Sequence, residues 1–190
     1  MLEDPVVPAR TCAAVVLAAT AAAVSVAAAP ATAAPSCGVV WGSTAETAAG
    51  SAGGTLDDVR TGRHACYDRL VLDLGAVDAG DVGHDVRYVP VVRQDGSGTA
   101  VPLRGSADLQ VVVHAPAHDA AGRATYDPAD DAEAADVSGY STFRQVAWAN
   151  SFEGRSTVGL GVRARLPFRV VVLDGPGDGS RLVVDVAHTW

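Results

Sequence analysis

The chain has 190 residues, with 14 basic side chains against 22 acidic ones and a formal net charge of −8 at pH 7. An acidic chain lacks the long-range attraction that brings basic proteins to phosphate backbones, so we expect no nucleic-acid partner. Its length is sufficient for one domain with a hydrophobic core.

Residues 1–33 have the features of a secretory signal peptide. An uncharged stretch rich in Ala and Val runs from Thr11 to Ala29, and Ala31-Thr32-Ala33 follows as a small-x-small cleavage pattern. The apolar run is short for a stable membrane span. We therefore predict cleavage after Ala33 and a location outside the cytoplasm, secreted or in the extracytoplasmic cell envelope. Because acidic residues near the amino terminus make the signal atypical, its retention as a weak anchor stays open.

Two cysteines, Cys37 and Cys66, remain after this processing, because Cys12 lies in the signal. In an exported chain such a pair predicts a disulfide, which would close a loop of roughly 30 residues and stabilise the fold by about 3 kcal/mol in the chain-entropy model. The alternative is lipidation of Cys37, against which Pro35 argues, because a lipobox has a small aliphatic residue there. We expect membrane contact only through an uncleaved signal or a lipidated Cys37.

Residues 34–55 are predicted to be a flexible linker of Gly, Ala, Ser and Thr that begins with a short strand near Trp41. From Leu56 onward, apolar residues recur at alternate positions between glycine-containing turns, and no window has a long helical period. The predicted strands are Leu56–Arg60, Tyr67–Leu74, Asp85–Val92, Asp108–His114, Thr142–Ala149, Ser156–Arg163, Pro167–Leu173 and Ser180–His188. This series predicts an all-β fold over residues 56–190, either a sandwich or a barrel.

Two of the predicted strands share one sequence pattern. Residues 69–73 and residues 181–185 both read Arg, Leu, Val, an aliphatic residue and Asp. Because side chains alternate along a strand, Leu70 and Leu72 face one side while Arg69 and Asp73 face the other. We interpret the two copies as halves of one β-structure that organises the fold and carries no reaction.

The longest segment without a strand pattern is residues 115–137, which has six acidic side chains against the single base Arg123. A loop of this length inside a domain is usually functional or mobile, and its role stays open. It lacks the ligand spacing and the central glycine of an EF-hand, so a solvated acidic loop is favoured over a calcium site.

His114 and His118 come nearest to a metal-binding motif. Pro116 between them excludes the helix that would place both imidazoles on one face, and a third ligand would have to come from elsewhere in the chain, for example His84 or His188. We therefore predict no metal, no cofactor and no catalytic residue. No serine lies in a Gly-x-Ser-x-Gly turn, and sequence alone does not place a carboxylate pair. A small secreted hydrolase with a metal or carboxylate site is the alternative.

A stretch rich in arginine and aromatic residues runs from Tyr140 to Arg169. Guanidinium groups suit carboxylates and phosphates, and aromatic faces suit sugar rings. The alternative is that the aromatic residues lie in the core and the arginines are ordinary surface residues. The predicted binding face consists of Arg144, Trp148, Arg155, Arg163, Arg165 and Arg169.

Several stretches resemble the AMIN-like domain family of actinobacterial secreted proteins and lipoproteins. They are Asp68–Leu74, Val86–Val89, Ala115–Asp119, Thr142–Val146, Leu160–Arg169 and Ser180–His188. The resemblance implies a single β-sandwich of about eight or nine short, mostly antiparallel strands. The related AMIN domains of cell-wall amidases and pilus secretins are non-catalytic modules that target peptidoglycan. The resemblance thus implies an exported binding module with peptidoglycan or a cell-envelope protein as partner. A structural or inhibitory partner of another secreted protein is a further alternative.

Overall fold

The computed structural model describes residues 37–50, 53–175 and 177–190. The predicted signal peptide and its cleavage site lie outside these residues. The chain divides into two units, residues 1–34 and 35–190, and the fold described below is that of the second unit.

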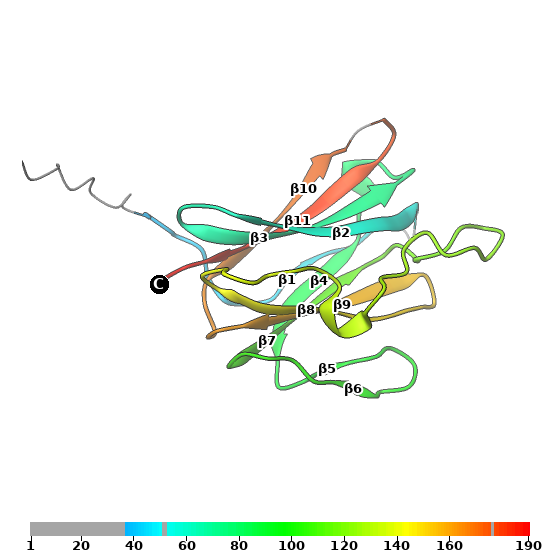
Figure 1. Cartoon of the computed structure of the whole chain (residues 1–190). Helices are drawn as coiled ribbons and strands as arrows, with labels where there is room; N and C mark the ends of the chain where they lie inside the picture. The colour runs from blue at the N-terminus through cyan, green and yellow to red at the C-terminus, as the bar shows by residue number, and fades with distance from the viewer. Residues whose placement is uncertain (1–36, 51–52, 176) are drawn as a thin grey trace, which may run out of the picture. The chain divides into compact units, whose positions relative to one another are not determined.

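Two antiparallel sheets form a single β-sandwich (Figure 1), which confirms the predicted fold class. The five-stranded sheet has the order β1-β4-β7-β9-β8, the four-stranded sheet has the order β10-β11-β3-β2, and β5 and β6 form a separate hairpin. Two short 3-10 turns, η1 (Ala79–Asp81) and η2 (Asp131–Glu133), lie in connecting loops. The strands are β1 (Glu46–Ala48), β2 (Thr55–Arg63), β3 (Tyr67–Gly75), β4 (His84–Val89), β5 (Val92–Arg93), β6 (Ala100–Val101), β7 (Ala107–Val113), β8 (Phe143–Phe152), β9 (Arg155–Val162), β10 (Phe168–Asp174) and β11 (Ser180–Ala187).

All eight strands predicted from alternation are present, with ends shifted by a few residues. β4 ends at Val89, because the following Pro90 has no N–H group to donate to the sheet. Two further differences concern short elements. β5 and β6 were not predicted as a hairpin of their own. The short strand predicted near Trp41 is wrong: residues 37–43 form no strand, and β1 lies further along the predicted linker, where it pairs with β4 through Glu46 opposite Val86. The small residues around β1 have no alternating apolar pattern that would predict a strand. β1 forms because its backbone pairs with the free edge of β4.

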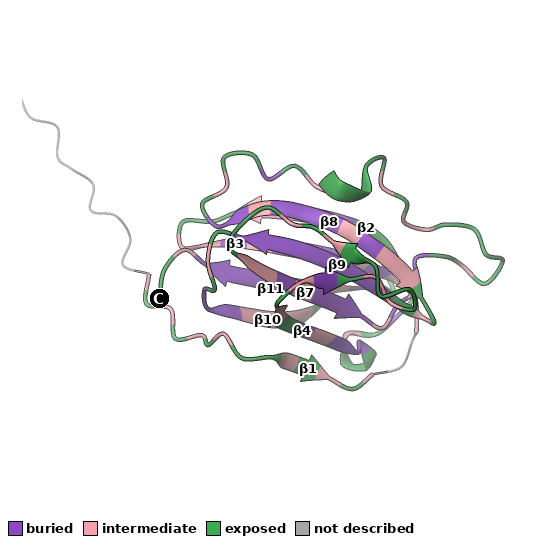
Figure 2. Cartoon of the chain, turned by 90° about the horizontal axis from the view of Figure 1, so that it is seen from below, coloured by how far each residue is buried: buried purple, intermediate pink, exposed green. Residues whose placement is uncertain are grey.

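The hydrophobic core lies between the two sheets. Leucine and valine side chains at alternate positions of β3 and β11 meet those of β7 and β9, and most of them are fully buried. Figure 2 shows buried residues along the strands of both sheets and exposed ones in the connecting loops. Burying a large aliphatic side chain contributes roughly 1.5–3 kcal/mol, so the alternation predicted from sequence supplies the main stabilisation.

The two copies of the repeated pattern form the neighbouring strands β3 and β11. Because the strands are antiparallel, Arg69 lies opposite Asp185, Val71 opposite Val183, and Asp73 opposite Arg181. The apolar residues between these positions belong to the core, so the charged ones lie on the outer face. The repeat therefore places each arginine across from the aspartate of the other copy.

The segment of residues 37–49, here called the N-terminal strap, covers one open side of the sandwich. A disulfide between Cys37 and Cys66, with a Cα–Cα distance of 5.5 Å, fixes its start and confirms the predicted pairing. The Gly42 carbonyl accepts a hydrogen bond from the Phe168 N–H (2.8 Å) at the edge of β10. The strap then reaches the other sheet as β1, so part of the predicted linker is an ordered connection.

The acidic segment of residues 115–137 covers the opposite open side, between the edges of β2 and β8. The Leu56 N–H of β2 donates to the Pro116 carbonyl (2.8 Å), and the Ala134 N–H donates to the Val146 carbonyl of β8 (2.8 Å). Val137 lies in the core. The segment thus supplies partners to strand edges whose N–H and C=O groups would otherwise be unpaired.

The β5–β6 hairpin packs on the outer face of the five-stranded sheet, as Figure 1 shows. Its side chains lie directly on the glycines that alternate with the core residues of β9: Leu103 and Val92 contact Gly159. At Gly161 an added Cβ would lie 2.0 Å from the Arg104 carbonyl oxygen. These glycines leave room for the hairpin, which explains why the second half of β9 has no side chains on its outer face, whereas the first half has Arg155 and Thr157.

We expect Gly161→Ala to lower the free energy of unfolding by about 2 kcal/mol, because the added methyl group meets a backbone oxygen that cannot rotate away. Urea unfolding measures the change. Gly80→Ala is the control, because a Cβ at Gly80 meets nothing within 4 Å and its φ is not positive. Equal midpoints for the two variants would contradict the close packing of the hairpin.

Candidate binding site

Two of the predicted binding residues, Arg165 and Arg169, hold the N-terminal strap. Arg165 donates from Nη2 to the Ser43 carbonyl (2.8 Å) and from Nε to its hydroxyl (3.2 Å). The guanidinium of Arg169 lies 4.4 Å from the ring centre of Trp41 and pairs with Asp185 at 2.9 Å. Both guanidinium groups therefore have partners within the fold.

Arg144 and Arg163 bind backbone carbonyls. Arg144 Nη1 donates to the Phe143 oxygen (2.8 Å) and the Tyr140 oxygen (3.2 Å), and Arg163 Nη2 donates to the His188 carbonyl. These contacts tie loop segments and the last residues of the chain to the sandwich, so they are structural.

Trp148 packs against the core. Its ring meets that of Tyr126 edge-on, with 5.1 Å between the ring centres. Burial raises the pKa of Tyr126 to about 12, so its phenol stays protonated. Trp148 thus belongs with the core residues, as in the alternative interpretation of the aromatic stretch.

Arg155 differs from the other five predicted residues. It is exposed at the start of β9, and its guanidinium makes no hydrogen bond or ion pair with any residue in the described part of the chain. Arg163 follows the other end of the same strand, which at about 3.3 Å per residue is roughly 26 Å away. The structure thus does not bring the six residues together on one face, because they lie on both sheets and at both ends of β9.

Arg155 lies beside a groove on the outer face of the five-stranded sheet, here called the Arg155 groove. It consists of two adjoining hollows of about 330 and 280 Å³ that share Asp95 and Arg155. The β5–β6 hairpin covers β9, and the larger hollow lies over the neighbouring strands β4 and β7. Its polar lining includes Asp85, Arg87, Asp95, Gln110, His114 and Arg155, and the smaller hollow adds Phe152 and Glu153.

The hairpin turn fixes Asp95 in the groove. Its N–H donates to Asn150 Oδ1 (3.1 Å), its carbonyl accepts from Asn150 Nδ2 (3.0 Å), and its Oδ2 accepts from the Thr157 hydroxyl (3.0 Å). The next residue, Gly96, has φ +77°. Because it has no side chain, the Phe152 ring packs directly against it. Phe152 is nevertheless 43% exposed. A rigid carboxylate and an accessible phenyl ring thus flank Arg155.

The floor of the larger hollow contains charges that are partly unpaired. Arg87 Nη2 lies 3.1 Å from Asp85 Oδ2, while Asp85 Oδ1 is buried and has no hydrogen-bond partner among the described residues. His114 Nδ1 lies 3.2 Å from the Gly50 carbonyl. Burial lowers the pKa of His84 below its usual value, so this neighbouring imidazole is neutral at pH 7. The acidic and basic side chains that line the hollow are Asp85, Asp95, Arg87 and Arg155.

The histidines considered as metal ligands do not converge. His118 lies in a loop, with Nδ1 3.1 Å from the Asp119 carbonyl, and His188 contacts Asp68. His84 and His114 line the groove without a third ligand. Across residues 37–50, 53–175 and 177–190, no group of three or more His, Cys, Asp or Glu side chains is placed to hold a metal ion.

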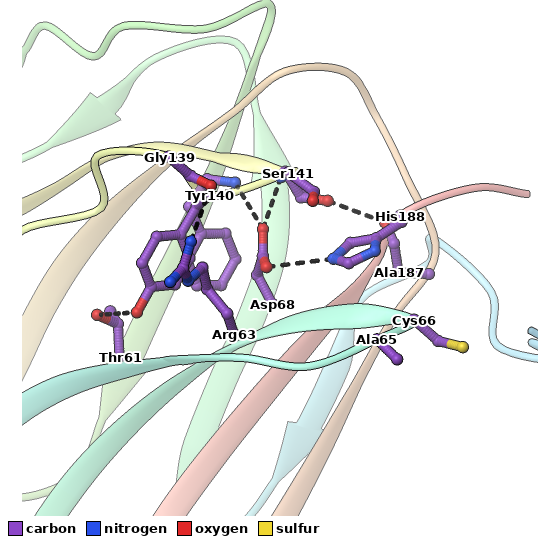
Figure 3. A network of polar contacts seen from close by, with 12 residues as sticks. Thr61, Arg63, Ala65, Cys66, Asp68, Gly139, Tyr140, Ser141, Ala187 and His188 are labelled. Atoms are coloured by element: carbon purple, nitrogen blue, oxygen red, sulfur yellow. Dashed lines mark hydrogen bonds and ion pairs between the residues drawn. The ribbon is translucent and has the colours of Figure 1, made fainter. Parts of the chain in front are cut away.

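A second polar cluster, centred on Asp68, connects the two sheets (Figure 3). Asp68 is fully buried, and its Oδ2 accepts hydrogen bonds from the N–H groups of Thr142 (2.6 Å) and Phe143 (3.3 Å). Its Oδ1 lies 3.1 Å from His188 Nε2. Because two of its partners are backbone groups at the start of β8, this carboxylate fixes β8 to β3 and is not free to bind a ligand.

A family model described as the AMIN-like domain matches residues 54–188. Neither a search of curated proteins nor a search of solved structures found a match. Among the residues that the structure describes, there is no helix of the length and apolar character needed to cross a membrane.

Proposed function

The chain belongs to the AMIN-like domain family, and from this membership we propose that it is an exported, non-catalytic binding module of the bacterial cell envelope. The proposed partner is peptidoglycan, with a cell-envelope protein as the second possibility. Its support is the family, together with a fold in which polar strand residues such as Asp68 and Asp185 are used to hold the sandwich together.

The observation that carries this proposal is the unpaired guanidinium of Arg155 beside a groove. A guanidinium that has no partner within the protein keeps all its donors for a ligand carboxylate, and such charge-assisted hydrogen bonds are among the strongest polar contacts. The exposed ring of Phe152 adds apolar surface next to it. Because the whole chain carries a net charge of −8, binding to an anionic wall depends on this local contact and not on long-range attraction.

We expect Arg155→Ala to weaken retention by isolated sacculi at least tenfold, because it removes one charge-assisted contact of about 1.5–3 kcal/mol. Cosedimentation with increasing amounts of sacculi measures the affinity. Arg123→Ala is the matched control: Arg123 is 82% exposed on the acidic segment and pairs with Asp119 on the same loop, and its loss changes the net charge equally.

Unchanged retention of Arg155→Ala would move the binding site elsewhere on the domain. Failure of the unmodified protein to cosediment would exclude peptidoglycan as the direct partner. A pull-down from envelope extracts, with Arg155→Ala as the comparison, would then test for an envelope protein.

A further inference from the structure

Resting on the proposed function, we infer that the Arg155 groove binds the peptide part of its ligand, a short peptide with a free carboxylate and a free ammonium group, and not the glycan strand. The charges of the groove, its unpaired guanidinium and its size favour such a ligand.

The groove carries both signs of charge at close range. Arg155 and Arg87 are its cations, and Asp85, Asp95 and Glu153 are its carboxylates. Arg155 lines both hollows. A ligand carboxylate bound to Arg155 therefore has acidic side chains of the protein in the hollow on either side. A ligand with one charge sign would leave the other set uncompensated, whereas a zwitterion matches both.

Two of these groups have unused bonding capacity. The Arg155 guanidinium has no partner among the described residues, and the Asp85 side chain is 26% exposed in the larger hollow beside Arg87. We therefore assign the ligand carboxylate to Arg155 and its ammonium group to the carboxylates of the larger hollow, with Asp85 as the first partner.

The aromatic content argues against a glycan. Sugar rings stack on broad aromatic faces, and the groove has one phenyl ring, Phe152, which lies on Gly96. The guanidinium of Arg169 lies over one face of Trp41 in the strap and of Tyr67 in β3, at 4.4 and 5.7 Å from the ring centres. The hollows, of about 330 and 280 Å³, have the size of amino-acid side chains and short peptides.

Binding of defined soluble fragments to the purified protein, measured by isothermal titration calorimetry, tests this inference. The probes are the stem peptide released from peptidoglycan, the same peptide with its carboxyl groups amidated or its amino groups acetylated, and peptide-free glycan strands. We expect the unmodified peptide to bind, either modification to weaken binding about tenfold or more, and the glycan strands not to compete.

The variants identify which end binds where. In Arg155→Ala, amidation of the peptide should make no further difference, while acetylation should still weaken binding. In Asp85→Asn, acetylation of the peptide should make no further difference, while amidation should still weaken binding. Competition by glycan strands, or equal affinity for the modified and unmodified peptides, would overturn the inference. Retention of the protein by sacculi without any binding of the free peptide would overturn it as well, yet leave the proposed function standing.

Discussion

Asp68→Ala is expected to lower the free energy of unfolding by about 4 kcal/mol. The substitution leaves the N–H groups of Thr142 and Phe143 without an acceptor in a buried position and removes the contact to His188. Each unsatisfied buried donor costs about 1–3 kcal/mol, and the lost acceptor is charged. Urea unfolding followed by circular dichroism measures the change.

Two further variants separate this contribution from general effects of charge. Asp127→Ala removes an exposed carboxylate of the acidic segment and should change stability by less than about 0.5 kcal/mol. His188→Ala removes one of the three Asp68 contacts and should cost about 1 kcal/mol. A loss in Asp68→Ala as small as that in Asp127→Ala would show that the carboxylate does not join the sheets.

Asp185→Ala is expected to cost about 3 kcal/mol. Asp185 is fully buried on the outer face of the four-stranded sheet, where it accepts hydrogen bonds from Arg69 (2.6 and 2.9 Å) and from Arg169 (2.9 Å). The hydrogen bond to Asp185 raises the pKa of Arg69 above its already high value. Breaking a buried ion pair costs about 3–5 kcal/mol, and the partial exposure of both arginines reduces the loss because water can reach them.

The sequence repeat supplies a matched control for this prediction. Asp73 occupies the same position of the pattern in β3, but its partner Arg60 is half exposed. Asp73→Ala should therefore cost less than about 1 kcal/mol, as for a surface pair. Comparable losses in Asp73→Ala and Asp185→Ala would mean that burial does not determine the strength of these pairs.

The strand series and the paired repeat were predictable because they depend on local alternation. Leu70 and Leu72 mark the inner face of β3 from their spacing alone, and the antiparallel pairing then brings Arg69 opposite Asp185. The same alternation also indicates the buried position of Asp68. Asp68 lies on the inward-facing side with these leucines, and a carboxylate at such a position indicates a buried polar partner.

The arginine face was not predictable, because the partners of these side chains come from distant parts of the chain. Arg165 binds Ser43, which precedes it by 122 residues, and Arg169 stacks on Trp41. No local pattern distinguishes such arginines from Arg155, whose guanidinium is left unpaired. The groove depends likewise on a turn, around Asp95, that is held by hydrogen bonds to β8 and β9.

The most direct test of the account is a map of where peptidoglycan fragments bind. Backbone amide resonances of the purified, ¹⁵N-labelled protein would be followed during titration with soluble fragments of digested peptidoglycan. We predict shifts at Asp85–Arg87, Asp95–Gly96 and Phe152–Arg155, and none at Trp41 or Arg169. Shifts confined to the outer face of the four-stranded sheet, or no shifts at saturating fragment, would contradict the assignment of the Arg155 groove as the binding site.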